Sequence, residues 1–302
     1  MTEFYEHVSL YHPDRLCDYL VSYLLDYCIE KDKFIDYRVE CCLQDNLIIF
    51  FGNINSNYAF SDQELQKELS YLMDKLDINC TYMFNVLLQK EKLKQRPLNG
   101  TGVYYGLATC GDFELPSNYI LSKELSNSLE ILFGKNYYKS SYIFTNNELV
   151  IDVTFTSKNI KQDNFEHIFK DLNIPYKINI HYKDQSKLLG MTGRKLSVDY
   201  YNSLIPNNGG SPWGKDPFNS DLVLNKYATK LAIDFRKENN LEYVMSKLIY
   251  LGNNEAILEF FDEINKPISK PQKIEIKPDL YKKLGLNKQI YARMCKKGFI
   301  FQ

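Results

Sequence analysis

The sequence lacks an excess of charge of either sign. It has 302 residues, with 37 Lys and Arg against 38 Asp and Glu, which gives a formal net charge of −1. A dedicated nucleic-acid-binding protein would usually carry a strong basic excess, so we expect no nucleic-acid partner, and any anion site must be built locally. The 44% of hydrophobic residues and 25% of charged residues are typical of a folded chain with a substantial core.

Metal-ligand spacings and long apolar runs are also missing. The four histidines are scattered, and the seven cysteines include no Cys-x-x-Cys pair, which favours reduced thiols over a disulfide framework or a zinc site. The longest apolar run, Leu47 to Phe51, has the length of a strand and is too short to cross a bilayer. The N-terminus shows no basic-then-apolar leader pattern, so we expect a cytoplasmic protein with no membrane partner.

What is present is a recurring order of strand, helix and hairpin. Pro13 suits the first turn of a helix, and apolar residues recur every four positions from Leu16. Ser61, followed three residues later by Glu64, is a capping-box arrangement at the start of another helix. The predicted helices span residues 13–30, 62–76, 117–133, 164–172 and 221–238. The predicted strands span residues 38–40, 47–54, 81–88, 103–108, 142–144, 149–156, 176–181, 195–200, 242–250 and 256–261.

This element order predicts an α+β fold of three similar domains in a pseudo-threefold arrangement. Each domain would be a mixed β-sheet with helices packed on one face. The domains would span residues 1–96, 97–183 and 184–302. Pro97 and the following glycine-containing loop end a highly charged stretch and mark the first boundary. Sequence identity between the three units is negligible, so the prediction rests on element order alone.

The residues around Pro13 are candidates for an anion site. His12, Asp14 and Arg15 surround the predicted helix start, where free backbone N–H groups and the helix dipole favour an anion. Asp14 could ligate Mg²⁺, and Arg15 could contact a phosphate. An ordinary helix cap would show the same residue types, so both interpretations stay open on spacing alone.

Two glycine-containing segments add further cations. The first, Gly190 to Lys195, reads Gly-Met-Thr-Gly-Arg-Lys and differs in spacing from phosphate-binding loops that open a helix. Arg194 and Lys195 could hold a polyphosphate there, although an exposed basic turn is the alternative. The second is the long loop of residues 207–216, which ends in Lys-Asp shortly before the helix predicted from Asp221. A loop of this length is either functional or structural.

Taken in order, several segments carry a resemblance to a known family. Val8 to Asp18 reads Val-Ser-Leu-Tyr-His-Pro-Asp-Arg-Leu-Cys-Asp, similar to Val-Ser-Glu-Gly-His-Pro-Asp-Lys-Ile-Cys-Asp. Gly190 to Asp199 is similar to Gly-Leu-Thr-Gly-Arg-Lys-Ile-Ile-Val-Asp, and the loop before Asp221 keeps Gly-Lys-Asp-Pro. Shorter matches lie at residues 39–40, 51–54, 102–109 and 227–228. Together these segments resemble the S-adenosylmethionine synthetase (methionine adenosyltransferase) family.

The resemblance implies a function and an assembly. Members of the family have three similarly folded domains and a homodimeric core, in some cases a dimer of dimers, with active sites at the subunit interface. They transfer the adenosyl group of ATP to the sulfur of methionine, and they hydrolyse the released triphosphate. Two Mg²⁺ ions and one K⁺ ion assist. ATP and methionine are therefore the expected substrates of this chain.

The resemblance also implies a role for each matching residue. His12 would lie beside the bond to the leaving oxygen. Asp14 and Asp221 would bind Mg²⁺, and Glu40 would bind K⁺. The expected phosphate-binding residues are Arg15, Lys139, Arg194, Lys195 and Lys215.

The departures from the family pattern affect the amino-acid half of the site. Gly100 stands where the family has an Asp, Asn53 where it has a Glu, and Lys187-Leu188 where it has Gly-Asp. A methionine ammonium buried without these carboxylates would be unpaired, at a cost of several kcal/mol. The alternative is therefore a weakened or inactive ATP- or triphosphate-binding homologue that acts as a regulatory or structural partner. A related enzyme with another sulfur nucleophile, or a triphosphatase, is a further alternative.

Overall fold

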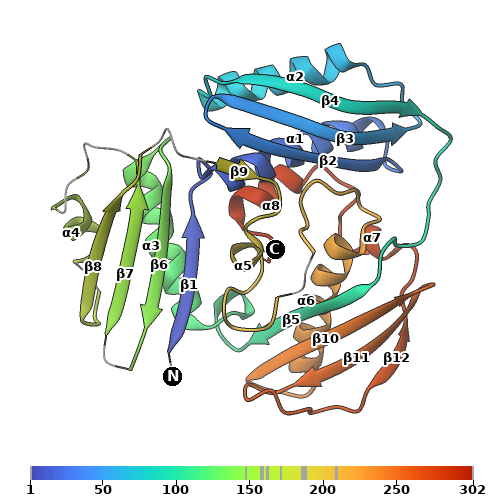
Figure 1. The fold of residues 1–302 in the computed structure, drawn as a ribbon. Helices are drawn as coiled ribbons and strands as arrows, with labels where there is room; N and C mark the ends of the chain where they lie inside the picture. Colours follow the sequence, from blue (N-terminus) through green and yellow to red (C-terminus); the bar gives the residue numbers. More distant parts are fainter. Residues whose placement is uncertain are drawn as a thin grey trace.

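Three four-stranded sheets and eight α-helices form the described part of the chain (Figure 1). The structure is a computed structural model that describes residues 2–146, 148–156, 160, 163–170, 172–184, 189–207 and 210–300. The predicted turn residue Asn147, the Lys187-Leu188 departure and Gly209 lie outside these residues. None of the described helices is long and apolar enough to span a membrane.

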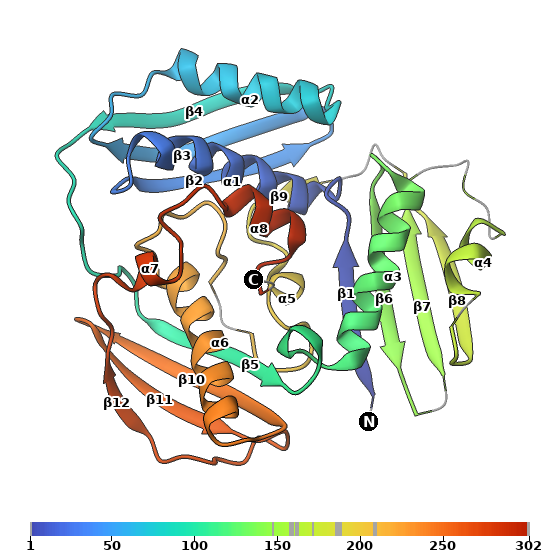
Figure 2. The ribbon, with the colours of Figure 1, turned by 180° about the vertical axis from the view of Figure 1, so that it is seen from behind.

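The first sheet has the strand order β4-β3-β2-β9. Its strands are β2 (Asp36–Gln44), β3 (Leu47–Ser56), β4 (Thr81–Lys90) and β9 (Leu189–Met191). β4 runs parallel to β3, whereas β3 and β9 both run antiparallel to β2. Helices α1 (Pro13–Lys31) and α2 (Asp62–Leu76) lie on one face of this sheet (Figure 2).

The second sheet has the order β1-β6-β7-β8 and the same mixed character. Its strands are β1 (Glu3–Val8), β6 (Tyr138–Phe144), β7 (Leu149–Phe155) and β8 (Tyr176–Tyr182). β8 runs parallel to β7, and the other pairs are antiparallel. Helices α3 (Ser117–Phe133) and α4 (Asp163–Phe169) cover one face (Figure 2).

The third sheet, β12-β11-β10-β5, is antiparallel throughout. Its strands are β5 (Gly102–Thr109), β10 (Tyr243–Gly252), β11 (Glu255–Phe261) and β12 (Gln272–Glu275), and α6 (Ser220–Glu238) packs against β5 and β10. The prediction of a mixed sheet is wrong here. A parallel strand needs a crossover of a dozen or more residues, usually helical, whereas only a short loop joins β11 to β12.

Each sheet takes one strand from a different segment of the chain. β1 precedes α1 yet pairs with β6, β5 precedes α3 yet pairs with β10, and β9 lies in the last third yet pairs with β2. The recurring order of strand, helix and hairpin is therefore present, but the strand before each of α1, α3 and α6 belongs to another sheet. The predicted domain boundaries at residues 96 and 183, and the pseudo-threefold relation, stay predictions.

Most predicted elements occur within a few residues of their expected bounds, and α2 and α3 have the predicted bounds. Ser61 caps α2 by accepting a hydrogen bond from the Glu64 amide at 3.2 Å. The strand predicted at residues 195–200 is wrong: this segment forms the short helix α5 (Leu196–Asp199). Burial of the Asp199 side chain against Arg15, at 2.6 Å, favours the helical turn over an extended strand. Helices α7 (Leu280–Lys283) and α8 (Tyr291–Lys297) have no counterpart in the prediction.

A glycine lets β9 lie against the first turn of α1. Gly190 leaves no room for a side chain, because a Cβ there would overlap the Pro13 backbone. The neighbouring Met191 amide donates to the Asp14 carboxylate at 3.0 Å. This close approach joins the Gly190–Lys195 segment to the start of α1.

We expect the Gly190→Ala substitution to push β9 away from α1 and to lower the free energy of unfolding by about 1–3 kcal/mol, as overpacking does. Denaturant unfolding measures this change, and faster amide exchange at Met191 would locate it. An unfolding free energy equal to that of the wild type would contradict this close approach.

Candidate functional site

The N-terminal turn of α1 presents a neutral imidazole. His12 is the cap residue, and its Nδ1 accepts a hydrogen bond from the Asp14 amide at 3.2 Å. Burial, reinforced by Lys195, Arg15, Lys139 and Lys183, lowers the pKa of His12 to about 2. With Nδ1 as acceptor, the proton of the neutral ring is assigned to Nε2, which is therefore a hydrogen-bond donor.

Asp14 brings the cations of the glycine segment to this turn. Its carboxylate is buried and lies 3.4 Å from the Lys195 Nζ and 3.8 Å from an Arg194 nitrogen. Arg194 is about half exposed, whereas Lys195 is mostly buried. The structure thus brings the adjacent residues Arg194 and Lys195 to Asp14, which is far from them in the sequence.

Lys139 reaches the same place from the second sheet. It lies on β6 and forms an ion pair with Glu6 of β1, and Glu6 also lies 3.8 Å from the Lys195 Nζ. We call His12, Asp14, Lys139, Arg194 and Lys195 the His12 cluster. It holds three cations and one carboxylate around a neutral imidazole, an arrangement suited to a multiply charged anion.

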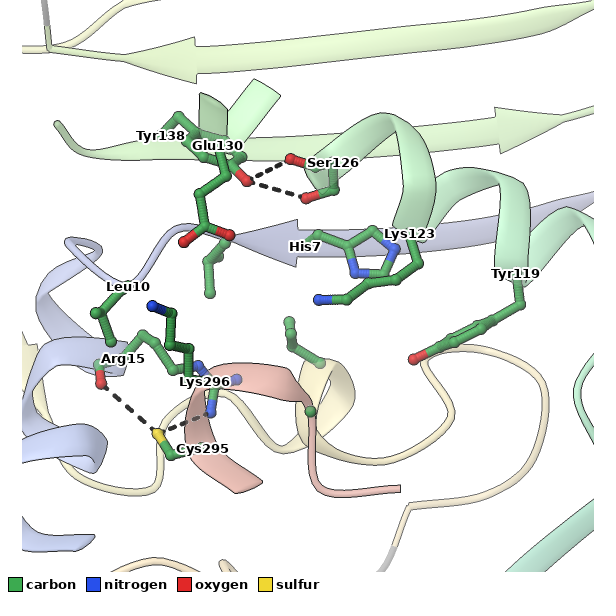
Figure 3. Close-up of a pocket in the computed structure, with 13 residues that line it drawn as sticks. His7, Leu10, Arg15, Tyr119, Lys123, Ser126, Glu130, Tyr138, Cys295 and Lys296 are labelled. Atoms are coloured by element: carbon green, nitrogen blue, oxygen red, sulfur yellow. Dashed lines mark hydrogen bonds between the residues drawn. The ribbon is translucent and has the colours of Figure 1, made fainter. Parts of the chain in front are cut away.

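Arg15 points away from this cluster. Its guanidinium is buried, 2.6 Å from Asp199 and 3.5 Å from Asp18, and it lines a small cavity of about 30 Å³ beside Cys295 (Figure 3). Burial opposes the charge of Arg15, but Asp199 and Asp18 outweigh burial and raise the pKa of the guanidinium. The predicted phosphate contact stays untested, and in this structure Arg15 is engaged in the protein interior.

A second group of predicted residues lies where α6 begins. The Lys215 Nζ donates to the Asp221 carboxylate at 2.6 Å, and Asp221 occupies the first turn of α6. Glu40, on β2, lies near Lys215 and Thr192. Burial raises the pKa of Glu40 to about 7, with Lys215 and Thr192 acting in the opposite direction. We call Glu40, Lys215 and Asp221 the Lys215 group.

The segment from Met191 to Lys195 connects the two sets of residues. The Met191 amide contacts Asp14, and the Gly193 amide donates to Asp18 at 2.7 Å. Between them, Thr192 contacts Glu40 and the Cys41 amide. Among the described residues, no hydrogen bond or ion pair joins the His12 cluster directly to the Lys215 group. One chain therefore presents two separate groups of predicted site residues.

Residues that the sequence did not single out also shape the site. Glu6 orients two of the three cations, and its own amide donates to the Asn202 side chain at 2.9 Å. Burial alternates along β1 (Glu3–Val8), but its sequence Glu-Phe-Tyr-Glu-His-Val does not alternate between polar and apolar residues, so no local pattern predicted this strand or the position of Glu6.

The chain is similar in fold to a solved structure. No protein-family model matches the sequence. A solved structure, described as that of an unusual S-adenosylmethionine synthetase from Campylobacter jejuni, matches over all of this chain and 95% of its own, with a TM-score of 0.83 and 18% sequence identity. The chain has the fold of that synthetase. At this level of identity the likeness establishes the fold, and the reaction is a separate question.

We expect the Arg15→Ala substitution to lower the free energy of unfolding by about 3–5 kcal/mol, because Asp18 and Asp199 would stay buried without a cation. Denaturant unfolding measures this change. The matched control is Arg38→Ala, whose side chain is 63% exposed and whose loss should cost less than about 0.5 kcal/mol. A stable Arg15→Ala protein with weakened nucleotide binding would instead support the phosphate role.

Proposed function

We propose that this chain is a divergent S-adenosylmethionine synthetase that transfers the adenosyl group of ATP to the sulfur of methionine, with release and hydrolysis of the triphosphate. The observation that carries the proposal is the His12 cluster. In a fold shared over the whole chain with a synthetase, this cluster gathers around one imidazole three of the five residues that the family resemblance assigns to the triphosphate, namely Lys139, Arg194 and Lys195.

In this proposal the side chains of the His12 cluster stabilise the leaving triphosphate. Negative charge grows on the triphosphate as the bond from its oxygen to C5′ breaks, and preorganised cations lower the energy of that state more than that of bound ATP. Lys139, Arg194 and Lys195 would supply this charge. The neutral His12 would donate its Nε2–H to the leaving oxygen, and its pKa of about 2 keeps it in this form at neutral pH.

The expected metal ions fit the residues only together with the substrate. Among the described residues, no group of three or more His, Cys, Asp or Glu side chains is placed to hold a metal ion. Mg²⁺ commonly binds proteins through one or two carboxylates and completes its shell with substrate phosphates and water. Asp14 and Asp221 would each hold one Mg²⁺ in this way, and Glu40 would hold K⁺. The ions would add positive charge next to the triphosphate.

The outer face of the first sheet supports a homodimer as part of the proposal. β-Sheet register places six exposed apolar residues on the face opposite α1 and α2: Leu47, Phe51, Met83, Leu87, Leu189 and Met191. Glu40 lies on this same face, directly opposite Phe51. A second copy that covers the face would bury Glu40 at the interface and bring a second subunit to the Lys215 group.

We expect the Met83→Glu/Leu87→Glu protein to be a monomer, because two charges would have to be buried in the dimer. Light scattering coupled to size-exclusion chromatography measures the mass. Tyr71→Glu is the matched control, since Tyr71 is an equally exposed apolar residue on α2, on the other side of the sheet. Dissociation by the control alone, or a wild-type monomer, would refute this interface.

A weakened or inactive triphosphate-binding homologue is the second candidate, and Gly100 favours it. Gly100 has a φ of +93°, and a Cβ there would contact the Ser220 hydroxyl, so the family's Asp does not fit this backbone. An active synthetase would need another carboxylate in its place, and Asp112, which follows the far end of β5, is roughly 25 Å away at about 3.3 Å per residue. The ammonium of methionine would then lack this carboxylate.

One assay separates the two candidates. Purified protein is incubated with ATP, Mg²⁺, K⁺ and methionine, and S-adenosylmethionine and phosphate are measured separately. We expect both products from the wild type and a loss of about 100-fold or more in kcat/KM from Lys195→Ala, because Lys195 would stabilise the leaving triphosphate.

The controls identify the other outcomes. Lys215→Ala should weaken triphosphate binding, and unchanged affinity would assign its loop a structural role. Lys75→Ala, an exposed lysine on α2, should change neither rate nor affinity. ATP binding without either product would favour the inactive homologue, and phosphate without S-adenosylmethionine would indicate a triphosphatase.

A further inference from the structure

A cationic groove of about 550 Å³ is lined by residues of α6, α7 and α8 and of the segment between α7 and α8, none of which belongs to the two groups of proposed site residues. Figure 1 shows where the three helices lie. Six of the residues that line it are basic: Lys226, Lys230, Lys283, Lys288, Arg293 and Lys297. None of its described lining residues is acidic. The apolar side chains of Leu284, Ile290 and Met294 complete the lining. This concentration of positive charge stands out in a chain whose net charge is −1.

Most of this charge is not neutralised locally. Lys230 pairs with Asp234 at 2.9 Å, and Lys283 pairs with Asp279 at 3.3 Å. The exposed side chains of Lys288, Arg293 and Lys297 form no ion pair within the part of the chain that is described. Three cations held in a concave surface raise the local concentration of anions and favour an anionic ligand.

Lys226 provides an independent indication of a ligand. It is only 9% exposed, and its ammonium donates to the Phe299 carbonyl at 2.6 Å. No described carboxylate pairs with it, and burial lowers its pKa to about 8. Because a buried ammonium without a counter-charge is costly, an anion seated in the groove would compensate for its burial.

We propose that this groove binds a compact polyphosphate group, either inorganic or carried by a nucleotide. Four cations that form no ion pair in the described chain, one of them Arg293 near Asp26, match several negative charges better than one, and arginine holds phosphate oxygens in pairs. The groove volume is that of a small-molecule site. An extended nucleic acid would need a continuous basic stripe, so a compact ligand fits the observations better.

The groove is distinct from the proposed active site. Asp221 and Lys226 are both on α6, but five residues turn the helix by about 500°, which places them roughly 140° apart around its axis. Lys230 follows Lys226 by four residues and shares its face. Tripolyphosphate binding here is therefore measurable in a protein whose His12 cluster and Lys215 group have been disabled.

The test uses the full-length Lys195→Ala/Lys215→Ala protein and titration calorimetry with sodium tripolyphosphate, without Mg²⁺, at low ionic strength. We expect one binding event in this background. Adding Lys288→Gln, Arg293→Gln and Lys297→Gln should weaken it by about 10-fold or more, since charge-assisted hydrogen bonds to phosphate are lost. Adding Lys67→Gln, Lys75→Gln and Lys90→Gln, three exposed lysines elsewhere, should leave it unchanged.

Comparing the affinities for ATP and for tripolyphosphate distinguishes a nucleotide ligand from inorganic polyphosphate. Equal affinity for ATP and tripolyphosphate would assign recognition to the phosphate chain, and tighter ATP binding would assign it to a nucleotide. The proposal would be overturned if the Lys195→Ala/Lys215→Ala protein did not bind tripolyphosphate, or if the two sets of three Gln substitutions weakened binding equally. Tighter binding of a single-stranded RNA oligonucleotide than of tripolyphosphate would also overturn it. A missing synthetase activity in the wild type would refute only the proposed function, because this titration does not depend on it.

Discussion

The buried contact between Arg15 and two carboxylates holds the centre of this molecule together. Arg15 comes from α1, Asp18 from the next turn of that helix, and Asp199 from α5. Burial raises the pKa of both carboxyl groups, so the single guanidinium is what makes their charges tolerable in the interior. Asp18 also accepts the Gly193 amide, which ties the glycine segment to the same point.

This contact determines where the chemistry of the chain is placed. With α5 held against α1, the residues just before it are held over the first turn of α1, where Asp14 meets Arg194 and Lys195. Gly190 then allows the backbone to approach Pro13 closely enough for the pairing of β9 with β2. Arg15, which the family resemblance assigns to phosphate binding, thus helps to position Arg194 and Lys195 through its contact with Asp199.

The exchange of strands between sheets has a related effect. β1 leads into His12 from the second sheet, β9 leads into Lys195 from the first sheet, and β6 carries Lys139. A site built from residues of both sheets depends on how the two sheets are positioned relative to each other, and neither sheet forms it alone. The Lys215 group is separate from the His12 cluster within one chain, which is the reason for proposing a dimer.

Three of the four strands in each sheet were predicted from local patterns, because they carry apolar runs or alternation bounded by turn residues, whereas β1, β9 and β12 were not. The helix α5 and the antiparallel order of the third sheet were also not predicted. Its antiparallel character comes from a short connection without a helix, and α5 forms because Asp199 is drawn into the interior by a partner 184 residues away. Neither cause is visible in a local window of sequence.

The sequence by itself determined the identity and order of the cationic and acidic residues, and the helix starts that present them, because capping and periodicity act over a few residues. Only the tertiary structure decided that Arg15 lies in the interior, that Glu6 orients Lys139 and Lys195, and that α6, α7 and α8 enclose a cationic groove. These features depend on contacts between residues distant along the chain, whose burial and charge are set by the packing of the whole molecule.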